Sequence, residues 1–223
     1  KLTQQPANRV FRVDTRPPTA VLTFSKASRQ YRAEPLSVTA DFSEDAAVDQ
    51  SPTIEVWGGA NGKWNQLFPP RPMQLAPGSG GKRWVYGHAA FAAGGTLDGN
   101  YWVYLGAKDI AGNPLLEQPP DRTFVIDTAA PVATLTYSKP SRMYRSVAFS
   151  VTADFTEDFG YSLTPTVEVR GGLASIANDT FSPQALSLVP GFGRRKWLYS
   201  RGPLAGSGVD DGSFTITLTA QDE

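Results

Sequence analysis

The side chains of this 223-residue chain that could do chemistry are mainly carboxylates, because cysteine is absent and histidine occurs once, as His88. The absence of cysteine excludes disulfides, thiolate zinc sites, iron–sulfur clusters and a cysteine nucleophile. A lone histidine in a loop is usually solvated, and an internal repeat described below puts Arg201 in its place. Acid pairs such as Glu44-Asp45 and Asp210-Asp211 could suggest glycoside hydrolysis, but two small sandwiches without an enclosed cleft argue against it. We therefore predict that the chain is not an enzyme.

Charge and hydropathy exclude two further classes of function. The 21 Lys and Arg residues balance the 21 Asp and Glu residues, whereas a nucleic-acid binder needs a basic face to neutralise phosphates. No uninterrupted apolar run approaches the roughly 18 residues that a membrane helix requires, so we expect no membrane insertion. Residues 1–6 show no apolar signal-peptide region, and any export signal would lie outside these residues.

The strongest signal in the sequence is an internal repeat with a period of 113 residues. Residues 11–59 match residues 124–172 without a gap, with 27 identities in 49 positions. Residues 2–11 resemble residues 115–124, at Leu2, Gln5, Pro6, Arg9 and Phe11. We therefore expect a piece of a longer tandem array, with three parts: a tail strand of a preceding repeat at 1–13, a first repeat at 14–126, and a second repeat at 127–223 whose last strand is missing.

Each repeat shows an apolar period of two, which predicts β-strands. In the second repeat, strands are expected at about 132–138, 147–155, 166–170, 196–200 and 213–220. In the first repeat, a last strand is expected at 122–126, and Gly58-Gly59 is interpreted as a turn. Segment 59–83 is expected to be irregular apart from a short strand near 73–76. The predicted fold class is all-β, with two tandem immunoglobulin-like antiparallel β-sandwiches that bury the repeated Trp84 and Trp197.

Four motifs at a fixed period resemble the bacterial immunoglobulin-like repeats of large surface adhesins, at 109–113, 127–131, 151–157 and 211–214. The resemblance implies a non-enzymatic extracellular stalk or spacer of a bacterial adhesin or surface fibre at the cell surface. Its implied partners are neighbouring repeats of the same chain, a cell-surface glycan or protein, or further copies in a fibre. The alternatives are a carbohydrate- or protein-binding module, or accessory domains of a secreted hydrolase.

Carboxylates from linkers and loops are expected to gather at the junctions between repeats. The set at the first junction is Asp14, Glu44, Asp45 and Asp109. The set at the second junction is Asp127, Glu157, Asp158 and Asp222, with Asp98 approaching from the first repeat. Calcium takes six to eight oxygen ligands in a flexible cage, and similar adhesin repeats bind calcium at their linkers. The alternative is that these residues form ordinary turns and hairpins, since the spacing lacks the dense Asp-x-Asp pattern of dedicated calcium loops.

Three aromatic residues of the first repeat lack counterparts in the second, where Arg170, Thr215 and Thr217 replace Trp57, Trp102 and Tyr104. The alternation of the surrounding strands predicts that all three point outward from one sheet. They could form a ligand-binding face. The alternative is that segment 59–83, with Trp64 and Phe68, folds over this face and buries it, because soluble proteins seldom expose large apolar patches without a use.

Overall fold

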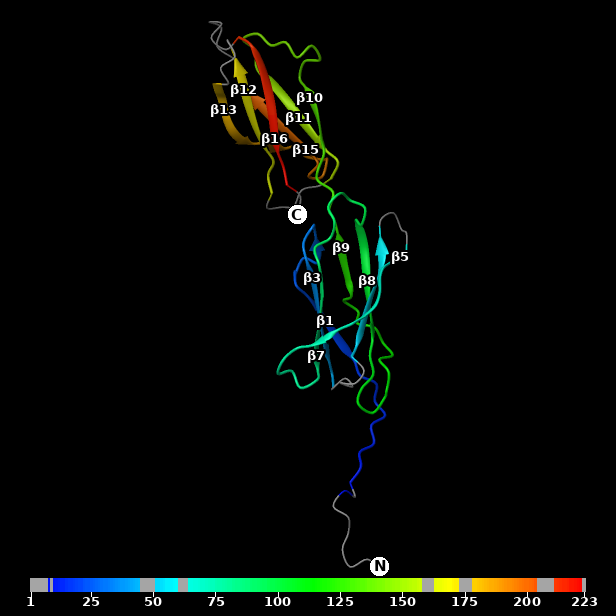
Figure 1. Cartoon of the computed structure of the whole chain (residues 1–223). Coiled ribbons are helices and arrows are strands. Elements are labelled where there is room, and N and C mark those ends of the chain that lie inside the picture. The colour runs from blue at the N-terminus through cyan, green and yellow to red at the C-terminus, as the bar shows by residue number, and fades with distance from the viewer. Residues whose placement is uncertain are drawn as a thin grey trace, which may run out of the picture. The chain divides into compact units, whose positions relative to one another are not determined.

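The computed structural model describes residues 8, 10–44, 51–59, 64–157, 163–172, 178–203 and 211–221, without the side chains of 178–182. The chain divides into two units, residues 1–129 and residues 130–223. Every regular element of the described residues is a β-strand (Figure 1). No helix of these residues is long and apolar enough to cross a membrane.

Unit 1 consists of two sheets with one core between them. The first sheet has the order β1 (Ala20–Phe24), β3 (Leu36–Phe42), β7 (Arg83–His88), β6 (Gln74–Leu75). The second has the order β2 (Gln30–Tyr31), β9 (Thr123–Ile126), β8 (Gly99–Gly106), β4 (Thr53–Gly59), β5 (Asn65–Pro72). Neighbouring strands are antiparallel, except that β2 runs parallel to β9.

The alternation of apolar and polar residues explains why these strands form a sandwich. In β3, Leu36, Val38, Ala40 and Phe42 are buried, while the residues between them are half-buried. The core combines side chains from both sheets, and burial of these apolar surfaces drives the two sheets together. Trp84 of β7 is 2% exposed, and its indole Nε1 donates to the carbonyl of Gly81 at 2.8 Å.

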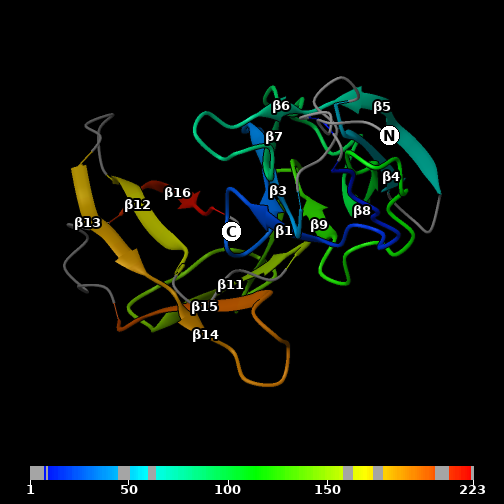
Figure 2. The same ribbon diagram turned by 90° about the horizontal axis from the view of Figure 1, so that it is seen from below.

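The described residues of unit 2 form two sheets on the same plan (Figures 1 and 2). One sheet has the order β10 (Ala133–Tyr137), β11 (Phe149–Phe155), β15 (Lys196–Arg201), β14 (Ser187–Leu188). The other has the order β13 (Asn178–Ala185), β12 (Thr166–Gly172), β16 (Ser213–Thr219). The register repeats as well: Ala133 pairs with Phe155 as Ala20 pairs with Phe42. Trp197 is 3% exposed and occupies the position of Trp84.

The predicted all-β class is confirmed, whereas the immunoglobulin-like topology stays a prediction. Two details of the sequence interpretation are wrong. Segment 59–83 is not irregular, because β5 runs through it as an edge strand, where prolines are tolerated since the missing N–H faces no partner. Gly58-Gly59 is not a turn but the end of β4. At Gly58, φ is +152°, and a Cβ atom would collide with the backbone of Asn100 and Tyr101.

The repeated tryptophans allow a stability test of the two units. Replacing Trp197 by Ala should cost unit 2 about 3–5 kcal/mol of unfolding free energy, as expected for truncation of a large buried aromatic. In urea unfolding followed by circular dichroism, the transition of unit 2 should move to lower denaturant. Trp84→Ala is the matched control and should destabilise unit 1. A Trp197→Ala variant with unchanged unfolding would contradict the assigned core.

Candidate functional site

Three carboxylates meet at one end of unit 1. Asp14 precedes β1, Glu44 follows β3, and Asp109 follows β8, and one ligand oxygen from each lies within 4.8 Å of the others. These are three of the four residues predicted at the first junction. The fourth, Asp45, lies outside the described residues. We name Asp14, Glu44 and Asp109 the acidic cluster.

Asp109 is built into the loop that follows β8. Its side chain is 2% exposed, and it accepts hydrogen bonds from the backbone N and the side-chain Nδ2 of Asn113, each at 2.8 Å. Burial by itself would raise the pKa of Asp109, but the donors at Asn113, Gly112 and Ala111 outweigh it and lower the pKa. Asp109 is therefore an ionised turn residue, as one alternative interpretation of the sequence held.

The pKa of Glu44 shifts in the opposite direction to that of Asp109. Desolvation raises its pKa, and the negative charges of Asp14 and Asp109 and a hydrogen bond with Asp14 raise it further. A hydrogen bond between two carboxyl groups needs a proton on one of them. The linker itself is held in place, because the Nδ2 of Asn113 also donates to the carbonyl of Asp14 at 3.2 Å.

The acidic cluster therefore concentrates negative charge that either a proton or a cation can relieve. Three carboxylates from three separate segments supply oxygen ligands of the kind that calcium prefers. Whether calcium binds there stays a prediction.

The residues predicted at the second junction are divided between the two units and the part of the chain outside the described residues. Asp158 and Asp222 lie outside the described residues, while Asp127 belongs to unit 1 and Glu157 to unit 2. The backbone N–H of Asp127 donates to the carbonyl of Tyr31 at 2.9 Å.

Asp98 has a role that the sequence interpretation missed. One carboxylate oxygen accepts from the backbone N of Thr128 at 2.7 Å and from its hydroxyl at 2.8 Å, and the other accepts from the backbone N of Ala129 at 3.2 Å. The carboxylate thus clamps the segment that follows β9. The sequence carried one signal for this contact, because both segments belong to the repeat. Asp98-Gly99 recurs as Asp211-Gly212, and Asp127-Thr128 matches Asp14-Thr15 at the repeat boundary.

The three aromatic residues predicted to share one face are brought together by Trp64. Trp57 and Trp102 pair across β4 and β8. The ring centroid of Trp64 lies 6.4 Å from Trp57, 5.0 Å from Trp102 and 6.4 Å from Tyr104. Trp64 is 51% exposed, whereas the other three are half-buried. The guanidinium of Arg122 lies 4.6 Å from the ring centroid of Tyr104.

The covering alternative therefore holds for Trp64 but not for Phe68. Phe68 is 6% exposed and faces the core. Its ring stacks on His88 at 5.5 Å, and His88 in turn stacks on Phe91 at 4.9 Å. His88 is therefore a half-buried ring at the end of β7 that stacks on two aromatic rings, and not the loop histidine that the sequence suggested.

Comparison with models of known protein families gives no match for this chain, and comparison with curated protein sequences gives none either. The resemblance to adhesin repeats is therefore carried by the motifs and the repeat alone.

The opposite pKa shifts in the acidic cluster predict how Glu44 affects stability. Because the folded state raises the pKa of Glu44, unit 1 loses stability as pH rises through that pKa and Glu44 becomes charged. In chelator, Glu44→Gln should raise the melting temperature of unit 1 at pH 7 by a few degrees, and the gain should vanish below about pH 4. Added calcium should raise the melting temperature of the wild type but not of Glu44→Gln.

Scanning calorimetry between pH 4 and pH 8 measures both effects. Glu117→Gln, which removes an exposed carboxylate outside the acidic cluster, is the control and should change neither. A lower melting temperature of Glu44→Gln at pH 7 would contradict the repulsion, and an equal calcium response in both proteins would contradict a calcium site at the cluster.

Proposed function

We propose that the chain is a non-enzymatic spacer: tandem immunoglobulin-like modules from the stalk of an extracellular bacterial adhesin or surface fibre. The observation that carries the proposal is that the polypeptide enters unit 1 at one end and leaves it at the other. When the chain enters and leaves a module at opposite ends, each added module lengthens a tandem array by about the length of its strands. Calcium at the acidic cluster would stiffen the entry end.

Both ends of unit 1 are fixed by hydrogen bonds that locate entry and exit. At entry, Asn113 in the loop after β8 holds the carbonyl of Asp14. At exit, Asp98, next to the first residue of β8, clamps Thr128. β8 has eight residues, which at about 3.4 Å per residue separates the two ends by about 24 Å.

The arrangement of β2 and β9 also suits a segment under tension. The N–H of Val125 donates to the carbonyl of Arg29 at 2.8 Å, and the N–H of Asp127 donates to that of Tyr31 at 2.9 Å. Because β2 and β9 are parallel and β9 leads to the exit, pulling the ends apart loads these bonds in shear together. Bonds loaded together must break together, which raises the barrier to forced unfolding.

The aromatic residues favour a second candidate function, a carbohydrate-binding module. Trp64 presents a half-exposed ring next to Trp57, Trp102 and Tyr104. Aromatic faces with polar neighbours suit the apolar faces and hydroxyls of sugars, and Glu55 and Gln66 supply such groups, joined by a hydrogen bond at 3.2 Å. The spacer proposal accounts for the repeat, whereas a carbohydrate-binding function accounts for the aromatic residues that only the first repeat has.

Single-molecule pulling tests the spacer proposal. Unfolding of unit 1 should release roughly 350–400 Å of chain, from the number of residues between its two fixed ends. Phe124→Ala should lower the unfolding force of unit 1, because Phe124 is 1% exposed and packs on Phe24, Tyr31 and Tyr101. The unfolding of unit 2 in the same molecule serves as the internal control. A unit 1 that extends without a resolvable unfolding event would end the spacer proposal.

Glycan titration tests the second candidate. If a glycan binds the aromatic residues, Trp57→Ala together with Trp102→Ala should weaken binding about tenfold or more, measured by tryptophan fluorescence or on a glycan array. Phe192→Ala, which removes a 49% exposed ring from unit 2, is the control and should bind as the wild type does. Equal binding by all three proteins would remove the aromatic face as a ligand site.

A further inference from the structure

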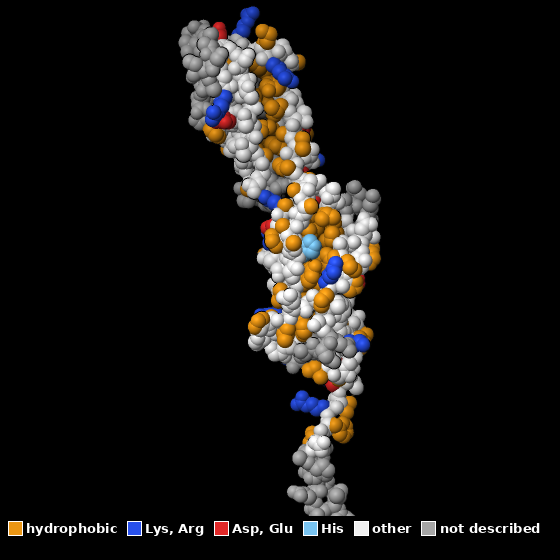
Figure 3. Space-filling model, viewed as in Figure 1, with side chains coloured by type: hydrophobic (Ala, Val, Ile, Leu, Met, Phe, Trp, Pro, Cys, Tyr) orange, Lys and Arg blue, Asp and Glu red, His pale blue; other side chains and the backbone are white. Residues whose placement is uncertain are grey.

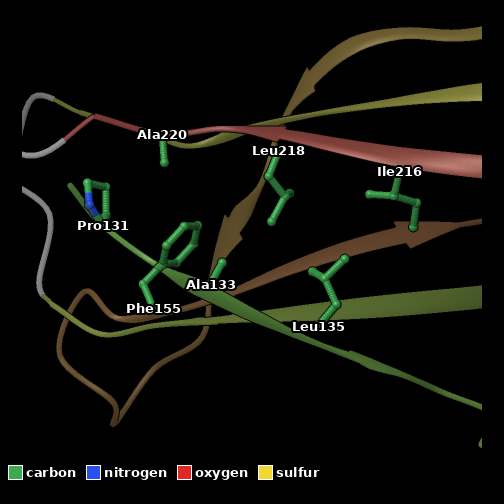
Figure 4. A pocket seen from close by; sticks show the side chains of 7 residues that line it. All are labelled: Pro131, Ala133, Leu135, Phe155, Ile216, Leu218 and Ala220. Atoms are coloured by element: carbon green, nitrogen blue, oxygen red, sulfur yellow. The ribbon is translucent and has the colours of Figure 1, made fainter.

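Apolar side chains reach the surface of the described residues in several places. In unit 2, a cavity of about 360 Å³ between β16 and the β10–β11 pair is lined by apolar side chains such as Leu135 and Phe155 (Figure 4). In unit 1, hydrophobic side chains gather around His88 (Figure 3). Phe68 and Phe91 stack on His88 there and are themselves buried. A ligand site needs more than this, namely apolar walls with a few polar groups that converge on them.

Four aromatic residues of unit 1 meet this requirement, and we name Trp57, Trp64, Trp102 and Tyr104 the aromatic platform. Trp57 belongs to β4, and Trp102 and Tyr104 belong to β8. Trp64 directly precedes β5 and contacts the other three rings, with 51% of its surface exposed. Because adjacent strands lie about 4.8 Å apart, the outer face from β4 across β8 to β9 is about 10 Å wide, enough for a sugar ring.

Oxygen-bearing side chains lie on both sides of the aromatic platform. On the β4 side, Glu55 is the register partner of Tyr104, and it accepts a hydrogen bond from the Nε2 of Gln66 at 3.2 Å. On the β9 side, Thr123 is the register partner of Trp102. Directly paired residues of neighbouring strands place their side chains on the same face of the sheet. Polar groups therefore flank the rings on the surface that a ligand would meet.

Arg122 adds a positive charge on the β9 side. Its guanidinium lies 4.6 Å from the ring centroid of Tyr104. The neighbouring carboxylate in the sequence, Asp121, faces Arg29 instead, with 4.0 Å between its Oδ1 and the Nη1 of Arg29. Within the part of the chain that the structure describes, Arg122 has no ion pair and no side-chain hydrogen bond. A guanidinium that rests on a ring keeps its N–H donors for an acceptor that approaches in its plane.

The same face of unit 2 is built differently. Arg170 and Glu168 stand where unit 1 has Trp57 and Glu55, and threonines take the two ring positions of β8. The Nη2 of Arg170 donates to Oε1 of Glu168 at 2.7 Å, so the acid and the cation neutralise each other. Unit 1 instead keeps its acid and its cation on opposite sides of the rings.

We propose that the aromatic platform binds an acidic glycan whose sugar rings carry a carboxylate, that is, a hexuronate, and that Arg122 binds this carboxylate. The C–H groups on one face of a pyranose ring pack on indole rings. A guanidinium holds a carboxylate through two parallel hydrogen bonds. Glu55 and Gln66 would accept hydrogen bonds from the sugar hydroxyls. The proposal rests on the carbohydrate-binding candidate and not on the spacer function.

The charges around the aromatic platform favour a hexuronate over a nucleic acid, whose bases could also stack on these rings. A hexuronate presents hydroxyls at one side of its ring and one carboxylate at the other, which matches Glu55 on the β4 side and Arg122 on the β9 side. A nucleic acid presents a phosphate at every nucleotide and binds to a basic face. It would meet the carboxylate of Glu55 as well as the guanidinium of Arg122.

Calorimetric titration of the 223-residue protein tests the proposal. The probes are tetrasaccharides of glucuronate, galacturonate and mannuronate, each compared with its carboxyl-reduced form, in which a hydroxymethyl group replaces the carboxylate. At least one hexuronate should bind the wild type about tenfold or more tightly than its carboxyl-reduced form. The difference should shrink as salt is added, because salt screens the attraction between guanidinium and carboxylate.

Variants of the protein separate the role of the charge from that of the rings. Arg122→Gln should bind both forms of the sugar equally, and Arg122→Lys should keep part of the preference. Trp64→Ala should weaken the binding of both forms, because the ring stacks on both. Arg71→Gln is the matched control and should bind as the wild type does, since Arg71 is an exposed residue of β5 whose charge acts on Tyr86 in the other sheet. Melting temperatures show whether each variant is folded.

Four outcomes would overturn the proposal. Equal binding of both forms by the wild type, lost in Trp64→Ala, would leave the carbohydrate-binding function and remove the acidic sugar. A preference for the hexuronate that persists in Arg122→Gln shows that the carboxylate binds elsewhere. A single-stranded tetranucleotide that binds more tightly than every hexuronate, and depends on Trp64, shows that the ligand is a nucleic acid. A wild type that binds none of the oligosaccharides would end the carbohydrate-binding candidate as well.

Discussion

The packing of Phe124 against Phe24, Tyr31 and Tyr101 is the interaction on which unit 1 depends. These rings come from β9, β1, β2 and β8, so this cluster joins both sheets. β9 reaches this position because residues 115–122 first run along β8, bonded at Ala107, Leu105 and Val103. The same strand that completes the core is thus the strand that carries the chain out of the unit.

Carboxylates do different work at the two ends of unit 1 because their surroundings differ. Asp98 and Asp109 each accept several N–H donors, which turns each side chain into a backbone clamp. At Asp109 these donors also lower the pKa of the carboxyl group. Glu44 finds other carboxylates instead of N–H donors, so desolvation and then repulsion from Asp14 and Asp109 raise its pKa. Acidic side chains therefore stabilise loops at Asp98 and Asp109, whereas at Glu44 the negative charge can be neutralised by a proton or a cation.

The sequence predicted the strands whose two faces differ most. β3 and β8 alternate cleanly between buried and more exposed positions, and their copies β11 and β16 keep the same apolar positions. β5 escaped prediction because Pro69, Pro70 and Pro72 argue against a strand unless it is known to lie at an edge. β2 has only two residues, too few for any periodicity, and it forms because it pairs with β9, 95 residues later in the chain. A strand that depends on such a distant partner is determined by tertiary structure and not by its local sequence.

The same limit applies to the candidate sites. The sequence placed Trp57, Trp102 and Tyr104 on one face through strand alternation, but the position of Trp64 depends on how β5 pairs with β4, where the register shifts twice. Likewise, the Asp98 clamp joins residues 30 positions apart. Both contacts join segments that no local pattern relates. The repeat therefore carries its strands in the sequence, whereas the sites depend on which segments tertiary structure brings together.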